Sequence, residues 1–238
     1  VSEQIIAVPH CNGRDYWIII HGYFTDARFY VYLLSPSGLT NASLSSNVPD
    51  VYGPFSARAR VGQLKASPNA SRIAMADWNH QNLAIYDFNS STGAITNETV
   101  LMTGQSIYGC SFDPTSQFLY ASVQSTNQIV SFSVTAPGTP TVVATGTQWW
   151  GMQIGPDGII YVAKQNNQFI SSINPPFTLT PGTTNNAVDL QQDQTNSPCV
   201  SCLFYNACLF RKNSAFKIAL SKKNLFCSEF YKFDVRSL

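Results

Sequence analysis

The chain has 238 residues, of which 44% are hydrophobic and only 11% are charged. Soluble domains commonly contain roughly 25% charged residues. The surface of this protein must therefore rely on neutral hydrogen-bonding groups. Such a composition is more typical of extracellular β proteins than of cytosolic enzymes. The formal net charge of +1 excludes recruitment of nucleic acid or of an anionic membrane by the field of the whole protein. No run of about eighteen apolar residues occurs, so the sequence predicts no membrane-spanning helix.

Four similar units follow one another along residues 1–176. Three to four short strands are expected in each unit, and two of them have clear bounds. These two lie at 15–21 and 29–35 in the unit near residues 1–40, and at 72–76 and 83–88 in the unit near 62–98. They lie at 118–123 and 128–134 in the unit near 107–145, and at 159–163 and 169–173 in the unit near 149–176. Pro9 in the first unit is aligned with Pro68 in the second. Pro68, Pro114 and Pro156 occupy the same place in the last three units. Their spacing of forty-odd residues is the period of a propeller blade.

Each unit repeats one order of elements. A short strand leads into a turn that contains proline, because proline presets φ and a neighbouring Asp, Asn or Gly closes the turn. An apolar strand, a polar turn and an alternating strand follow, with no helical pattern between them. A single sandwich is the alternative, but it does not require a regular period. The sequence therefore predicts an all-β fold, a β-propeller with about four blades, as a partial ring or as part of a larger ring such as a seven-bladed one.

Two segments depart from this order. Residues 40–62 are rich in Ser, Asn, Pro and Gly and lengthen the first interval, so we expect a surface loop there. Residues 177–238 are expected to form a Thr/Asn-rich loop or irregular strand pair, followed by a cysteine-rich tail. Residues 211–238 carry a net charge of +5, which favours a solvated surface over a partner-binding segment. The N-terminus has neither a methionine nor a signal pattern, so we expect a processed form or a fragment.

Four of the six cysteines lie in the tail. These are Cys199, Cys202, Cys208 and Cys227. If the protein is exported, they can form disulfides that staple a segment with little core of its own. Their spacing fits a zinc ribbon poorly, so disulfides or free thiols are favoured over a metal site. The other two, Cys11 and Cys110, lie in strand-like contexts where buried structural cysteines are expected.

The repeats resemble those of known propellers. SFDPTSQFLYASVQSTNQIVSFSV is similar to the units of lactonase-like and surface-layer β-propellers. AVPHCNGRDYWIIIHG, LKASPNASRIAMADW, IYDFNSSTGAITN and IGPDGIIYVAK, in that order, resemble the propeller-like domain of large secreted Bacteroidetes proteins that carry gliding-motility-associated or type IX secretion sorting domains. The resemblance covers about residues 1–176. It implies secretion or a cell-surface location and supplies no catalytic residues. The sorting domain of that family is not found in this sequence, and the cysteine-rich tail is not expected from the family.

The start of each innermost strand is the predicted ligand site, because it borders one mouth of a propeller channel. Arg60, Tyr108, Trp149 and Trp150 precede or adjoin a glycine that permits close backbone approach at the axis. Aromatic and Arg side chains dominate recognition sites. The alternative is that these residues pack between blades. Trp149 and Trp150 face opposite ways in a strand, so at most one of them stacks on a ligand.

Catalytic signals are weak. The three histidines, His10, His21 and His80, occupy different places in the blades, and the acidic residues are spread singly. No nucleophile elbow, phosphate loop or zinc-protease motif occurs. We therefore expect no metal and no cofactor, and a non-enzymatic function is favoured over an enzymatic one.

Three functions remain open. The first is a non-enzymatic binding or adhesion module of a secreted or cell-surface protein, with a protein or glycan ligand and no nucleic acid. The second is a lactonase-like hydrolase with a metal in the propeller channel. The third is a structural subunit that self-associates through exposed blade edges.

Overall fold

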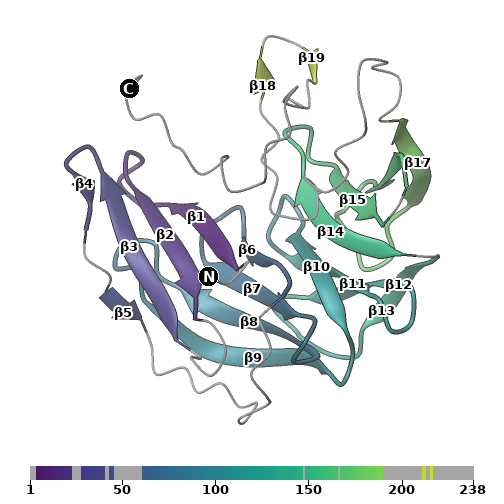
Figure 1. Ribbon diagram of the computed structural model, residues 1–238, viewed down its shortest axis with the longest axis horizontal. Coiled ribbons are helices and arrows are strands. Elements are labelled where there is room, and N and C mark those ends of the chain that lie inside the picture. Colours follow the sequence, from purple (N-terminus) through teal and green to yellow (C-terminus); the bar gives the residue numbers. More distant parts are fainter. Residues whose placement is uncertain are drawn as a thin grey trace.

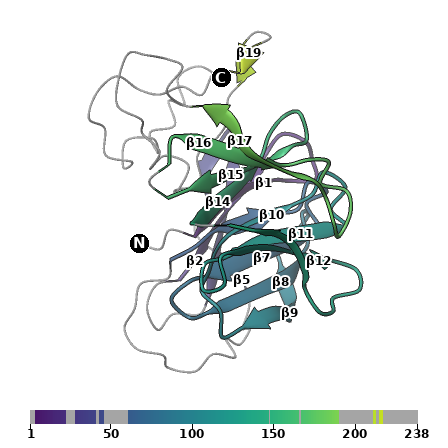
Figure 2. The same cartoon turned by 90° about the vertical axis from the view of Figure 1, so that its right-hand side faces the viewer.

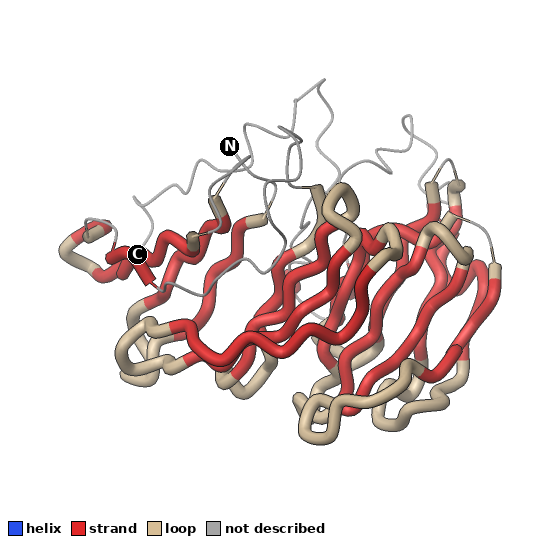
Figure 3. The backbone as a smooth tube through the Cα atoms, turned by 90° about the horizontal axis from the view of Figure 1, so that it is seen from below, coloured by secondary structure: helices blue, strands red, loops and turns tan. Residues whose placement is uncertain are grey.

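The computed structural model describes residues 4–22, 28–40, 43–45, 61–146, 148–165, 167–189, 211–212 and 215–216. These residues form strands, turns and loops and contain no helix, as Figure 3 shows. Accordingly, no helix in the described part of the chain is long and apolar enough to cross a membrane.

Four antiparallel sheets follow one another along the chain, and each sheet is one blade. Blade 1 contains β1 (Ile5–Pro9), β2 (Tyr16–His21), β3 (Phe29–Ser35), β4 (Gly38–Leu39) and β5 (Ser43–Ser45). Blade 2 contains β6 (Leu64–Ala66), β7 (Arg72–Asp77), β8 (Asn82–Phe88) and β9 (Ile95–Thr103). Blade 3 contains β10 (Ile107–Phe112), β11 (Phe118–Val123), β12 (Gln128–Ser133) and β13 (Thr141–Thr145). Blade 4 contains β14 (Trp149–Ile154), β15 (Ile160–Lys164), β16 (Phe169–Ile173) and β17 (Thr183–Asp189). A separate short pair is formed by β18 (Arg211–Lys212) and β19 (Ala215–Phe216).

The blades are arranged as in a β-propeller. Within blades 2, 3 and 4 the strands pair in chain order, so the first strand and the last strand lie at opposite edges of the sheet. The first strands, β6, β10 and β14, lie close together, and β1 of blade 1 lies beside β6 (Figure 1). Figure 2 shows the same sheets from the side, with their faces packed on one another. The predicted fold class, a β-propeller with four legible blades, is confirmed.

One hydrogen bond recurs after the first strand of every blade. The backbone N–H donors are His10, Ser67, Asp113 and Gly155, and the acceptors are the carbonyls of Asp15, Arg72, Phe118 and Ile159. In blade 3 the carboxylate of Asp113 also accepts hydrogen bonds from the backbone N–H groups of Thr115, Gln117 and Phe118. This explains the Asp-Pro turn of CSFDPTSQF, because an Asp side chain caps the donors that a tight turn leaves over.

Apolar side chains fill the three interfaces between successive blades. The cluster between blades 1 and 2 includes Val8, Trp17, Ile19, Ile73 and Met75. The cluster between blades 2 and 3 includes Ala74, Leu83, Cys110, Phe112 and Phe132. The cluster between blades 3 and 4 includes Tyr120, Ile129, Trp149, Met152 and Val162. Because central strands of each blade bury residues on both faces, their sequences read as continuous apolar runs.

Blade 4 reaches further along the chain than the expected repeat boundary at residue 176. β17 pairs with β16 in a segment for which a loop or an irregular strand pair was expected. The connection between these strands crosses to blade 3, where the Tyr120 hydroxyl donates to the Thr178 carbonyl at 2.6 Å. The Ser131 hydroxyl donates to the Leu179 carbonyl at 2.5 Å. The connection therefore links blade 4 to blade 3 through these two hydrogen bonds.

Candidate functional site

The inner strands of blades 2, 3 and 4 begin at the same end of the sheets. We call this end the rim and define it by Gly62–Gln63, Tyr108–Cys110 and Trp149–Met152. The backbones approach closely here: the Gln63 N–H donates to the Tyr108 carbonyl at 2.9 Å, and a methyl group added to Gly109 would overlap the Trp150 carbonyl oxygen. A glycine is thus required at position 109, because the backbone of the neighbouring strand lies too close for a side chain.

Gln63 connects the three inner strands. Its side-chain Oε1 accepts hydrogen bonds from the backbone N–H groups of Cys110 at 3.2 Å and Met152 at 2.9 Å, and the residue is buried. The Lys65 ammonium group also crosses from blade 2 to blade 4, where it donates to Gln153 Oε1 at 2.8 Å. The rim is therefore held by polar side chains that reach across blades, as well as by the apolar clusters between them.

An aromatic cluster, which we define as Trp78, Tyr108 and Trp150, lies beside Gln63 on three different blades. The Tyr108 and Trp150 ring centroids are 4.7 Å apart with planes at 62°, and those of Trp78 and Trp150 are 6.3 Å apart. Tyr108 is buried, Trp150 is partly exposed, and Trp78 is 36% exposed. The exposed part of the cluster is thus formed by the two indole rings, which can offer apolar faces to a ligand.

Trp78 was missed by sequence reasoning. It follows the second strand of blade 2, and its backbone N–H donates to the Val61 carbonyl at 2.8 Å. The same bond is made in blades 3 and 4 by Gln124 and Gln165, at 2.8 Å and 3.0 Å. An alignment on the second strand would have shown that a tryptophan occupies this place in blade 2 alone.

Of the predicted site residues, Tyr108 and Trp150 lie together in the aromatic cluster, whereas Trp149 points away from it. Trp149 is 2% exposed and packs between blades 3 and 4, as the alternation of strand side chains requires. The Lys164 ammonium group lies 4.8 Å from the centroid of its ring. Arg60, Cys199, Cys202, Cys208 and Cys227 lie outside the described residues.

Asp77 and His80 form a polar pair next to the aromatic cluster, at the turn that carries Trp78. The Asp77 carboxylate accepts the His80 backbone N–H at 3.1 Å and lies 2.8 Å from the His80 Nδ1 atom. Both side chains are almost fully buried. A third group for a metal is missing, because no set of three His, Cys, Asp or Glu side chains converges in the part of the chain that the structure describes.

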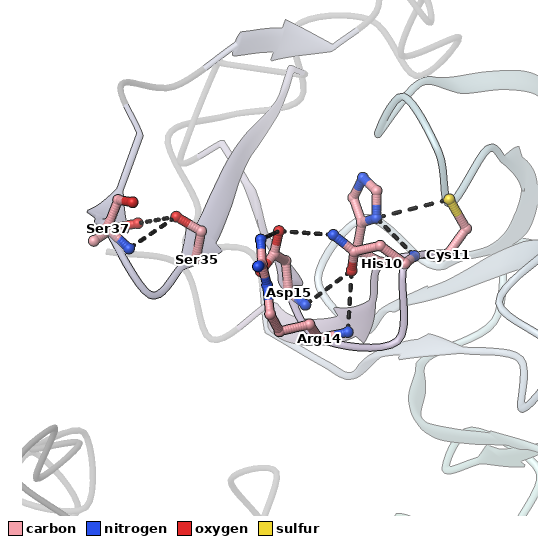
Figure 4. Close-up of polar contacts among 8 residues, drawn as sticks. His10, Cys11, Arg14, Asp15, Ser35 and Ser37 are labelled. Carbon is pink, nitrogen blue, oxygen red and sulfur yellow. Dashed lines mark hydrogen bonds and ion pairs between the residues drawn. The ribbon is translucent and has the colours of Figure 1, made fainter. Parts of the chain in front are cut away.

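A second polar cluster lies in the turn between β1 and β2, at the end of blade 1 opposite the rim (Figure 4). His10 Nδ1 accepts the Asn12 N–H at 3.0 Å, and Arg14 forms an ion pair with Asp15 at 2.9 Å. Hydrogen bonds from Arg14 and then from Asn12 hold the pKa of Asp15 below its ordinary value. These contacts close the turn on itself, so we assign them a structural role.

The two described cysteines differ. Cys11 is exposed in the turn between β1 and β2, so the expectation that it is buried is wrong. It lies just after β1 and outside the ladder, where its side chain faces solvent. Cys110 is buried in β10, as expected, and burial raises the pKa of its thiol to about 12.

No protein-family model matches the sequence, and no curated protein matches it. Solved structures do match. A candidate 6-phosphogluconolactonase from Bacteroides uniformis shares 16% identity at a TM-score of 0.50, with 76% of this chain and 56% of that chain covered. The periplasmic gluconolactonase of Pseudomonas aeruginosa shares 12% identity at a TM-score of 0.50, with 75% and 56% covered. A protein from Lactobacillus plantarum shares 18% identity at a TM-score of 0.53, with 78% and 55% covered.

These likenesses concern the fold. The chain spans little more than half the length of the solved structures it matches. Its structural neighbours include lactonase-like β-propellers, and its four blades have the same architecture as part of such a ring.

Proposed function

We propose that the rim binds a small sugar-type ring, the class of molecule to which aldonolactones belong. The observation that carries the proposal is the aromatic cluster, in which three blades bring Trp78, Tyr108 and Trp150 to one end of the fold. Two partly exposed indole rings offer stacking faces, as sites for apolar sugar faces require. The proposal keeps the binding function expected from the sequence and adds Trp78 to the candidate residues.

The groups around the cluster fit a neutral, hydroxyl-rich ligand. The amide side chains of Gln63 and Gln124 lie at the rim, where Gln124 Nε2 donates to the Trp149 carbonyl at 2.6 Å. Lys65 is the only charged residue in the inner strands β1, β6, β10 and β14. Amides and backbone groups can donate to and accept from hydroxyl groups, so they suit a sugar better than a strongly charged ligand.

The comparisons add support of a limited kind. Two of the matched propellers are described as lactonases of phosphogluconate or gluconate chemistry, and their substrates are sugar rings of the proposed class. Because the chain spans 56% of each of them, an activity of a whole propeller remains a proposal for this chain.

A second candidate function is hydrolysis of the lactone, and the Asp77–His80 pair favours it. When the Nδ1–H of a histidine is held by a carboxylate, Nε2 keeps a lone pair that can take a proton from water. His80 has this arrangement through its contact with Asp77 at 2.8 Å. The hydroxide formed in this way would attack the ester carbonyl, the ring C–O bond would break as the tetrahedral intermediate collapses, and the proton held by His80 would pass to the departing ring oxygen. No step would pass through a metal.

Calorimetric titration with D-glucono-1,5-lactone tests the binding proposal. We expect the Trp150→Ala variant to bind about tenfold more weakly or worse, since such anchors commonly dominate recognition. Tyr16→Ala is the matched control, because Tyr16 is an exposed aromatic residue at the opposite end of blade 1. Equal affinity of the wild type and Trp150→Ala, or no heat of binding at millimolar lactone, would contradict the proposal.

A pH-stat assay on the same samples separates the two functions. Hydrolysis above the spontaneous rate that is lost in His80→Gln but retained in His10→Gln supports catalysis at the pair, since His10 lies in the remote turn. Binding without turnover restricts the function to recognition.

We also propose that the protein is secreted or lies at the cell surface, because its charge is low and its repeats resemble those of secreted Bacteroidetes proteins. Its candidate partners are a glycan or a protein to which it adheres, and further copies of the chain that associate through blade edges. Fractionation of the native host tests the location. Mass measurement in solution tests the self-association.

A further inference from the structure

A buried amide lies at the rim end of the interface between blades 1 and 2. Asn82 begins β8, is 1% exposed, and lies opposite Asp77 in the ladder of β7 and β8. The next residue on the same face of β8, Ala84, belongs to the apolar cluster between these blades. Asn82 therefore places a second buried polar side chain, beside Asp77, at the rim end of a mostly apolar interface.

Neither polar atom of this side chain has a hydrogen-bond partner among the residues that the structure describes. Both Oδ1 and Nδ2 are buried, and neither makes a hydrogen bond within that part of the chain. The cross-strand neighbour does not supply one, because the Asp77 carboxylate is directed to the backbone and ring of His80. Buried amides are almost always satisfied by protein groups or by bound molecules, since an unsatisfied group keeps its full desolvation cost.

The chemistry of the amide restricts what can satisfy it. Oδ1 requires a donor, and Nδ2 requires an acceptor. A cation would serve only Oδ1, an anion only Nδ2, and an apolar group neither. One hydroxyl-type oxygen serves both, because it donates through its O–H and accepts through its lone pairs.

We propose that Asn82 binds one hydroxyl-type oxygen, from a water molecule or from a hydroxyl group of a ligand, at the interface of blades 1 and 2. The site lies on the face of blade 2 that is turned to blade 1. It is distinct from the aromatic cluster and does not depend on the proposed function.

NMR of the full chain with ¹⁵N-labelled asparagine tests the site directly. The Asn82 side-chain signal is assigned by its loss in Asn82→Leu. A through-space exchange signal between this amide and long-lived water in the free protein identifies a water. A signal that forms only with added D-glucono-1,5-lactone, and runs to the sugar, identifies a ligand hydroxyl. Absence of both signals overturns the proposal.

The stability of Asn82→Leu is an independent test, because an empty site and an occupied site predict changes of opposite sign. Leu has a similar size and no polar atoms, so if nothing occupies the site the variant should be as stable as the wild type or more so. If a water is bound there, loss of its partners should lower the folding equilibrium constant by about tenfold. Should the variant fail to fold, the Asn82 side-chain signal is assigned from the backbone of the uniformly labelled wild type, whose NMR then still decides.

Discussion

Replacement of Gln63 by methionine tests how the inner strands are held together. Methionine keeps the length of the side chain but removes the oxygen that accepts the N–H groups of Cys110 and Met152. Each buried N–H that is left without an acceptor costs about 1–3 kcal/mol, so we expect a loss of about 2–6 kcal/mol in the free energy of unfolding. The Gln63→Glu variant retains an acceptor oxygen and should recover part of the loss.

The assay is urea unfolding followed by circular dichroism, with Gln117→Met as the control. Gln117 is an exposed residue in the turn of blade 3, and surface substitutions of this kind usually change stability by less than about 0.5 kcal/mol. A Gln63→Met variant as stable as this control would refute the assigned role of the Gln63 side chain, because the two N–H groups would then have found other partners.

Three further predictions follow from single contacts. Gly109→Ala should cost at least about 1–3 kcal/mol in the same urea assay, because the new methyl overlaps the Trp150 carbonyl; wild-type stability would contradict the close approach. Iodoacetamide at pH 8 should label exposed Cys11 and spare Cys110, whose thiol is buried with its pKa raised to about 12; equal labelling by peptide mass would contradict this. The pKa of Asp15 is lowered in the folded protein, so its contribution to stability is present above the ordinary carboxyl pKa of about 4 and is lost as pH falls through the lower, folded value. In Asp15→Asn the free energy of unfolding should therefore depend less on pH in this range, and an unchanged dependence would contradict the prediction.

The propeller could be predicted because its repeats leave a strong local pattern. The residues of β11 and β16 alternate or run apolar between turn residues, and both strands have the bounds expected from the sequence. β17 was not expected as a regular strand because TTNNAVD is mostly exposed and polar. An outer strand at the edge of a blade packs against little, so its sequence carries no apolar signal.

The first blade shows a limit of alignment on proline. Pro9 lies inside β1 and pairs with Tyr16, whereas Pro68 lies in the turn after β6. The recurring turn bond shows that His10 corresponds to Ser67, so Pro9 corresponds to Ala66 and not to Pro68. The repeat was identified correctly, but its register in blade 1 depended on a residue with a different role.

The site could be predicted only in part. The glycine-linked aromatic positions led to Tyr108 and Trp150, which do meet at the rim. Trp78 could not be found in the same way, because it follows the second strand of its blade and reaches Trp150 across two blade boundaries. Gln63 has no local signal either, since its role depends on two N–H groups that lie 47 and 89 residues further along the chain. Contacts between blades depend on how the blades pack together, so the sequence of a single repeat does not reveal them.

A crystal structure of the protein soaked with D-glucono-1,5-lactone would test the proposed site most directly. The proposal predicts density for a sugar ring against the indole faces of Trp150 and Trp78 at the rim. Density elsewhere on the protein, with the aromatic cluster bare at saturating lactone, would contradict it.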